Sequence, residues 1–163
     1  MTISNPNSHM RMSSAGRVHL RNTEALRTKY YNDGGRNKGN CTYGYGTLIQ
    51  PRRLCTVSEL RTTVPMSMIE HSLERKLTEF ERAIHRNVTY PLNQAQFDAL
   101  VSYTYNRGAG GAARTYEFIN NGDFQGAIDE MNSRIYSTQG GKSVLMPGLV
   151  IRRQAETAPF RMP

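Results

Sequence analysis

The sequence predicts an α+β fold: a small antiparallel sheet lobe near the N-terminus, a larger helical lobe, and a cleft between the two. Three observations support this fold class. Between Lys29 and Gln50, β-forming residues alternate with turn residues. After that stretch, apolar residues recur every three or four positions, as in amphipathic helices. The chain has 163 residues, which is enough for one compact domain with its own core.

The start of the chain predicts a lead rather than a folded element. Residues 1–12 are polar and lack the apolar core and small-residue cleavage site of a secretion signal. We expect a disordered lead over 1–12, one domain over 13–163, and synthesis in the cytoplasm without a signal peptide. No apolar run approaches the ~20 residues that span a bilayer, so we expect no membrane insertion.

The first half of the domain contains local signals for each expected element. Ser13 or Ser14 is placed to cap a first helix that runs to about Arg27. The stretch that follows, with Asp-Gly-Gly and Tyr-Gly-Tyr-Gly turns, predicts a small antiparallel hairpin region. Thr56 and Glu59 have the spacing of a capping box, which predicts a short helix after the sheet.

The second half predicts a series of helices. Apolar spacing predicts one long amphipathic helix over 66–87. Asn93 and Gln96 form a second capping box, and the run Gly108–Gly111 is expected to stop the helix that they open. The sequence then predicts a short helix over about 114–120, a helix capped by Asp123, and a last helix from Pro147-Gly148 to about Ala158.

Charge favours a polyanionic partner without naming it. Lys and Arg number 21 against 13 Asp and Glu, giving a net charge of +8. The basic residues are spread along the chain, and there is no recognition-helix, zinc or RNA-binding pattern, so we expect no nucleic-acid partner. The histidines have no metal-ligand spacing, and we expect neither a metal nor a cofactor.

Two cysteines, Cys41 and Cys55, flank the glycine-rich strand stretch. If they pair, the closed loop would stabilise the fold by about 3 kcal/mol in the chain-entropy model. Pairing would require an oxidising compartment such as the periplasm. The alternative is two small buried thiols, and the sequence leaves both open.

A pair of carboxylates provides the candidate chemistry. Glu24 lies near the end of the first expected helix, and Asp33 lies at the first turn of the sheet. Hydrolysis of a glycosidic bond uses such a pair, one protonated to donate to the leaving oxygen and one ionised to activate water or stabilise positive charge. Thr42 follows where its hydroxyl can hold the attacking water. The alternative is that Asp33 only forms a turn and that Glu24 only pairs with an arginine.

The order of short motifs resembles the phage-type lysozymes, glycoside hydrolase family 24. Its active-site segment is matched by Glu24-Ala-Leu-Arg-Thr-Lys-Tyr-Tyr-x-Asp33 and Thr42-Tyr-Gly-Tyr-Gly46. Its central helix and turn are matched by Pro91-Leu-Asn-Gln-x-Gln-Phe-Asp-Ala-Leu-Val-Ser102 and Tyr105-Asn-Arg-Gly108. Later motifs, Gly122-Asp-Phe-x-Gly-Ala and Pro147-Gly-Leu-Val-x-Arg-Arg, extend the resemblance to nearly the whole domain.

The resemblance implies a lysozyme-like fold and cleavage of the β-1,4 bond between N-acetylmuramic acid and N-acetylglucosamine in peptidoglycan. It implies that Glu24 is the general acid, Asp33 its partner carboxylate and Thr42 the hydroxyl that positions water. Asn106 falls where the family places an amide that lines the cleft. Arg152 falls near an arginine that braces the acid, and its neighbour Arg153 is the alternative for that role. Tyr45 is a further candidate for contact with sugar.

The sequence departs from the family pattern at two places. Eight residues separate Asp33 from Thr42, whereas the family usually has about five, and a longer turn costs little free energy. The insertion either returns Thr42 to the same place or displaces Asp33 and leaves Asn37 or Asn40 nearer the site. Thr47 also replaces a histidine that often follows the sheet in the family.

Two biological settings fit a monomeric peptidoglycan hydrolase without a signal peptide. One is a phage endolysin, released to its own host's cell wall through a holin. The other is an antibacterial effector injected into the periplasm of a target cell, which predicts a cognate immunity protein. The alternative function is a catalytically degraded lysozyme fold that only binds peptidoglycan.

Overall fold

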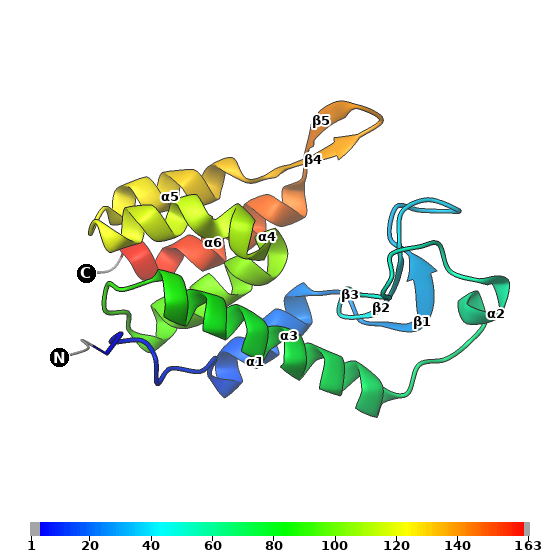
Figure 1. Ribbon diagram of the computed structural model, residues 1–163. Helices are drawn as coiled ribbons and strands as arrows, with labels where there is room; N and C mark the ends of the chain where they lie inside the picture. Colours follow the sequence, from blue (N-terminus) through cyan, green and yellow to red (C-terminus); the bar gives the residue numbers. More distant parts are fainter. Residues whose placement is uncertain (1–3, 162–163) are drawn as a thin grey trace. The chain divides into compact units, whose positions relative to one another are not determined.

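The structure is a computed structural model that describes residues 4–161, and it divides the chain into two compact units. The sheet unit comprises residues 18–76 and contains a three-stranded sheet. The helical unit comprises the residues up to 17 and those from 77 onward (Figure 1). This confirms the predicted mixture of a small N-terminal antiparallel sheet and a larger helical part. Within the described residues, no helix has the length and apolar character needed to span a membrane.

The sheet is built from three short antiparallel strands. They are β1 (Arg27–Asn32), β2 (Cys41–Gly44) and β3 (Thr47–Leu48), in the spatial order β1-β2-β3. Gly44 ends β2 with a positive φ of 65°, and a Cβ there would lie 2.9 Å from Cγ2 of Ile69. Only glycine therefore lets the end of this strand lie against Ile69 without strain or a shift of its neighbour.

Helix α2 (Val57–Leu60) is anchored by the predicted capping box. The Thr56 hydroxyl accepts from the Glu59 amide at 3.1 Å, and the Glu59 carboxylate accepts from the Thr56 amide at 2.9 Å. Just beyond α2, the Val64 amide donates to the carbonyl oxygen of Thr28. The segment after α2 is thereby attached to β1.

The first helix is shorter than predicted. Helix α1 (Ser14–Thr23) is capped by Ser13, whose hydroxyl accepts from the Gly16 amide at 3.0 Å, but it ends well before Arg27. Arg27 begins β1 instead, because pairing with β2 overrides the weak helical pattern. The long helix predicted over 66–87 is confirmed as α3 (Met66–Asn87).

The predicted helix stop falls at Gly108, where two helices meet across a kink. Helix α4 (Gln94–Asn120) opens at the predicted Asn93–Gln96 capping box and has non-helical angles at Gly108, with φ 75° and ψ 161°. The chain returns to helix immediately, earlier than the short helix expected from about residue 114. The second part buries Ala112, Tyr116 and other side chains, and this packing outweighs the low helix propensity of the glycine-rich run.

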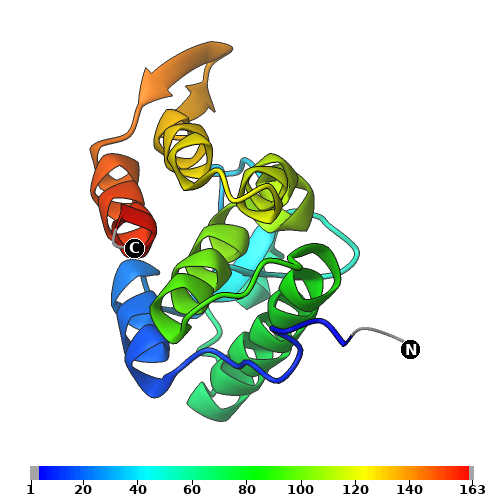
Figure 2. The ribbon, with the colours of Figure 1, turned by 90° about the vertical axis from the view of Figure 1, so that its left-hand side faces the viewer.

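The remaining helices pack against α4. Helix α5 (Phe124–Ser133), capped by Asp123, and helix α6 (Pro147–Arg161) contact α4 and each other (Figure 2). Between them lies an antiparallel hairpin that we did not predict, formed by β4 (Tyr136–Gln139) and β5 (Lys142–Leu145). Its signal was Gly140-Gly141, both with positive φ, which forms the two-residue turn.

Residues 4–12 are packed, which corrects the expectation of a disordered lead over 1–12; residues 1–3 lie outside the described range. The Asn7 side chain is 1% exposed and donates to the carbonyl oxygens of Val88 and Tyr90 at 3.0 and 2.8 Å. Asn5 donates to His85 and Val88 in the same way. The polar residues of this segment satisfy carbonyl groups at and just after the end of α3, which composition alone did not reveal.

Candidate active site

The loop between β1 and β2 is closed at its base around Asp33. The Asp33 amide donates to the Asn40 carbonyl oxygen at 3.0 Å, and the Asn40 amide donates to Oδ1 of Asp33 at 2.7 Å. Inside the loop, Gly34 donates to the carbonyl oxygen of Lys38. The extra residues are thus accommodated in a compact turn whose two ends lie side by side.

This closure returns Thr42 to the strand that carries the candidate site. In the β1–β2 register, Thr42 lies opposite Tyr31 and Cys41 lies opposite Asn32. The Thr42 side chain is 2% exposed, and its hydroxyl donates to the carbonyl oxygen of Asn40 at 2.9 Å. With its proton used in this way, the oxygen's lone pairs are left as acceptors, which is the role needed to hold a water molecule.

Glu24 and Asp33 both affect the pKa of one group, the phenol of Tyr31. Burial raises the pKa of Tyr31 above its ordinary value; the Arg27 cation opposes this rise, and the carboxylates of Asp33 and Glu24 add to it. The Arg27 guanidinium lies over the Tyr31 ring, 4.2 Å from its centroid. Both carboxylates therefore lie within electrostatic range of the same side chain, although nine positions separate them in the sequence.

The backbone explains why Glu24 is placed there. Its amide donates to the carbonyl oxygen of Leu20 at 2.8 Å, which extends the helical pattern of α1 by one residue. The side chain is half-buried, whereas Asp33 is exposed. A helix end and a strand end thus supply the two carboxylates, and their role as a catalytic pair stays a prediction.

Tyr45, the predicted sugar contact, lies in the turn between β2 and β3 and is only 6% exposed. Its phenol contributes to the raised pKa of Arg21, whose largest cause is the hydrogen bond to Glu70 at 2.7 Å. Little of the ring is open to a ligand, and its role in binding stays a prediction.

In the helical unit, Asn106 is held by an arginine through a contact that the sequence did not predict. Asn106 is exposed, and its Oδ1 accepts from Nη2 of Arg153. This hydrogen bond uses Oδ1 as the acceptor and leaves Nδ2 as the remaining donor of the amide. Arg153 is itself 1% exposed, stacks 4.8 Å from the Tyr103 ring centroid, and donates to the Arg134 carbonyl oxygen at 3.0 Å.

Arg152 belongs to the same buried cluster. Its Nη2 donates to the Ser102 carbonyl oxygen at 2.8 Å, and its Nε lies 3.2 Å from Oε2 of Glu156. Glu156 also accepts from Arg153 and, at 2.6 Å, from the Ser102 hydroxyl. The i, i+3 and i, i+4 spacing of the two arginines to Glu156 was the signal for this cluster. The predicted bracing of Glu24 by Arg152 stays a prediction.

Comparison with known proteins shows the family of this chain. The sequence model of the phage lysozyme family matches residues 21–156, a range that includes every candidate catalytic residue. The chain belongs to the phage lysozyme family.

Two curated relatives of this phage lysozyme chain are endolysins. One, from Bacillus phage B103, is 32% identical over 153 residues, covering 93% of this chain but only 54% of the relative. The other, from Acyrthosiphon pisum secondary endosymbiont phage 1, is 29% identical and is covered over 98% of its length. The chain therefore spans about half of the first relative and nearly all of the second.

A solved structure extends the similarity to the fold of the phage lysozyme chain. The endolysin from Escherichia coli O157:H7 phage FAHEc1 matches with a TM-score of 0.77 and 28% identity, covering 93% of this chain and 94% of that one. The lysozyme-like fold class predicted from the sequence is confirmed.

This phage lysozyme chain contains a disulfide between Cys41 and Cys55, which decides between the two alternatives that the sequence left open. The Cys41 amide donates to the Arg53 carbonyl oxygen at 2.6 Å, and the Cys55 amide donates to Oδ1 of Asn32 at 2.8 Å. The disulfide therefore links segment 53–55 to β2, which carries Thr42. The hydrogen bond to Asn32 links the same segment to the end of β1, next to Asp33. Within residues 4–161, no cluster of His, Cys, Asp and Glu is arranged to hold a metal ion.

Proposed function

We propose that this protein is a muramidase that hydrolyses the β-1,4 bond between N-acetylmuramic acid and N-acetylglucosamine in peptidoglycan. The observation that carries the proposal is that Glu24 and Asp33 both lie within electrostatic range of Tyr31, which is the partner of Thr42 in the β1–β2 register. Membership of the phage lysozyme family and the endolysin relatives support the same reaction.

In this proposal Glu24 is the general acid and protonates the leaving glycosidic oxygen. Asp33 is the partner carboxylate, which activates the attacking water or stabilises the oxocarbenium-like charge. Thr42 holds the water through its oxygen, whose proton is already given to Asn40. The Asn40 amide donates to Oδ1 of Asp33, and this hydrogen bond orients the carboxylate.

Three further residues are assigned supporting roles in the same proposal. Asn106 binds sugar through Nδ2, the donor that remains when its Oδ1 accepts from Arg153. Tyr45 adds a contact to the substrate. Arg152 supports the general acid. No cofactor enters these roles, and the acceptor of the glycosyl group is water.

The disulfide supports action in an oxidising compartment such as the periplasm, where cell-wall substrate is found. Two biological roles involve action in this compartment. One is an endolysin that reaches the wall of its own host, and the other is an effector injected into a target cell. The second role adds a cognate immunity protein as partner.

The test is release of reducing ends from purified peptidoglycan by wild type and the Glu24→Gln variant. We expect wild type to cleave and the variant to lose about 10²–10⁴-fold in rate, because glutamine keeps the shape of the acid but donates no such proton. Glu79→Gln, an exposed change on α3, is the matched control and should keep full activity.

Equal cleavage by wild type and Glu24→Gln would show that another group is the acid. If neither protein cleaves and both still sediment with sacculi, the chain is a lysozyme fold that only binds peptidoglycan.

A further inference from the structure

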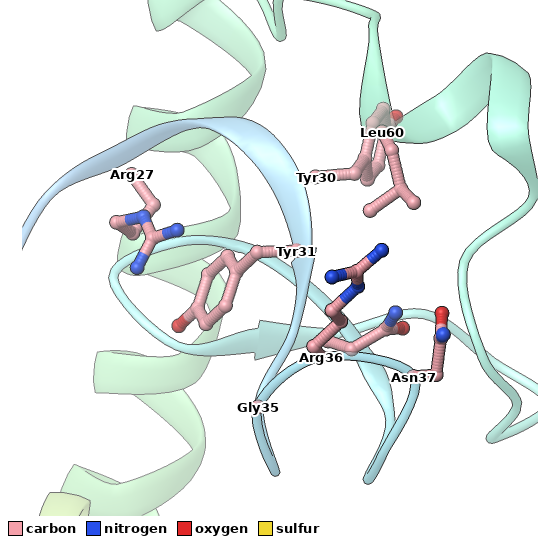
Figure 3. A pocket seen from close by; sticks show the side chains of 8 residues that line it. Arg27, Tyr30, Tyr31, Gly35, Arg36, Asn37 and Leu60 are labelled. Carbon is pink, nitrogen blue, oxygen red and sulfur yellow. The ribbon is translucent and has the colours of Figure 1, made fainter.

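A hollow of about 580 Å³ lies on the sheet unit beside the extra residues of the β1–β2 loop (Figure 3). Strand β1, this loop and helix α2 contribute its lining. The lining includes the side chains of Arg27, Tyr30, Tyr31, Arg36, Asn37 and Leu60. The loop that departs in length from the family pattern therefore builds a binding surface of its own.

The charged side chains that line the hollow are all positive. Both charged side chains that line it, Arg27 and Arg36, are arginines, and no carboxylate lines it. Arg27 lies over the Tyr31 ring, whereas Arg36 is exposed and has no ion pair or side-chain hydrogen bond among residues 4–161. Arg36 is thus the cation available to an anionic ligand, and its planar guanidinium suits a carboxylate.

The uncharged lining matches a short peptide. Asn37 presents an amide from a loop position with a positive φ of 56°. Tyr30 and Leu60 face Arg36 on one side of β1 in Figure 3, and Tyr30 is held edge-on against Tyr43 at 5.5 Å between ring centroids. An amide, an aliphatic side chain and an aromatic ring fit the amides and methyl groups of a peptide, whereas a phosphate polymer has neither group to offer them.

The hollow is continuous with the candidate site through one loop and one strand. Arg36 and Asn37 lie in the loop that Asp33 and Asn40 close at its base. Tyr31 both lines the hollow and is the residue on which Asp33 and Glu24 act. The hollow and the candidate site therefore share Tyr31, so one extended substrate can reach both.

We propose that this hollow binds a carboxylate of the stem peptide that peptidoglycan carries, and that Arg36 is a specificity-determining residue for peptide-bearing over peptide-free glycan. This inference rests on the proposed function and names the substrate class more closely. It assigns a role to the residues that the chain adds between Asp33 and Thr42.

The test compares the Arg36→Gln variant with wild type on two substrates. One is purified peptidoglycan without teichoic acid or lipopolysaccharide, and the other is the same glycan after an amidase has removed its peptides. We expect Arg36→Gln to lower kcat/KM about 10-fold on the first substrate, mainly through KM, and less than about 2-fold on the second. Arg52→Gln removes one exposed charge of the same unit outside the hollow and should affect both substrates equally.

Equal losses for Arg36→Gln and Arg52→Gln, or equal losses on both substrates, would overturn the inference. A loss that appears only when walls retain teichoic acid would assign the anion as phosphate and overturn it as well. A binding measurement tests this inference separately from the proposed function, because it needs no turnover. Nuclear magnetic resonance titrations measure the affinity of the protein for the soluble disaccharide and for the disaccharide-peptide. If wild type cleaves nothing but prefers the disaccharide-peptide, and Arg36→Gln loses that preference, the muramidase proposal fails and this inference stands.

Discussion

Glu156 is a buried carboxylate of the helical unit that pairs with two buried arginines. It is 1% exposed and accepts from Arg152, Arg153 and the Ser102 hydroxyl. Two guanidinium groups therefore share one carboxylate in a region from which water is excluded. Such clusters fix geometry more than they add stability, but removal of one partner leaves a charge unpaired.

We expect Glu156→Gln to lower the free energy of unfolding by about 3–5 kcal/mol, because it removes the buried carboxylate that Arg152 and Arg153 share. Urea denaturation followed by circular dichroism measures this change. Glu117→Gln, an exposed change on α4, is the matched control and should stay within about 0.5 kcal/mol of wild type. A Glu156→Gln variant as stable as the control would contradict this. The remaining partners of the two arginines, including the carbonyl oxygens of Ser102 and Arg134, would then be enough to hold them in the folded protein.

At the scale of elements, helix α2 depends on a capping carboxylate that also pairs with a cation. The hydrogen bond from Arg53, at 2.6 Å, and those from Thr56 lower the pKa of Glu59 to about 2 from its ordinary value of 4.5. Because the folded pKa lies below the unfolded one, the stabilising contribution of Glu59 is present above pH 4.5. It is lost as the pH falls toward 2, where the carboxylate becomes protonated in the folded state.

We therefore expect the difference in Tm between wild type and Glu59→Gln to be constant near neutral pH and to vanish between about pH 4.5 and 2. Thermal denaturation across this range measures the difference, and carbon-detected nuclear magnetic resonance measures the pKa directly. In Arg53→Gln the titration of Glu59 should move back toward 4.5, since the largest cause of the shift is gone. A midpoint that does not move would assign the shift to the Thr56 cap alone.

Elements with strong local signals were predictable, and elements set by distant contacts were not. Both capping boxes and the long helix α3 follow from residues within one or two turns of each other. The packing of Asn5 and Asn7 depends on carbonyl groups about eighty positions away, which no local pattern contains. The hairpin over β4 and β5 was missed because its strands are short and exposed, so no alternation marks them.

The candidate site divides in the same way. Glu24, Asp33 and Thr42 lie in one short stretch of sequence, and the resemblance of that stretch to the phage lysozyme active-site segment selected them as candidates. The link between Arg153 and Asn106 was not predicted because it spans 47 positions and appears only when α6 packs on α4. The hollow around Arg36 was missed because a lengthened turn has no sequence signature for the surface that it builds.

At the scale of the whole molecule, positive charge is concentrated in one segment. Residues 25–64 contain seven Lys and Arg against two Asp and Glu, which is a net +5 of the total +8. That segment includes the strands and loops that carry Asp33, Thr42 and Arg36. Long-range attraction therefore brings an anionic wall preferentially toward the part of the chain that is proposed to act on it.

We expect the affinity of the Glu24→Gln variant for peptidoglycan sacculi to fall at least ~10-fold between about 0.05 and 0.5 M NaCl, because salt screens exposed charges beyond a few ångströms. Co-sedimentation at each salt concentration measures the affinity, and the inactive variant prevents loss of substrate during the assay. Chitin, a glycan without net charge, is the matched control and should show little salt dependence. A flat salt curve on sacculi would mean that short-range contacts in the sugar and peptide sites supply the affinity. The charge of the segment over 25–64 would then have no part in recognition of the wall.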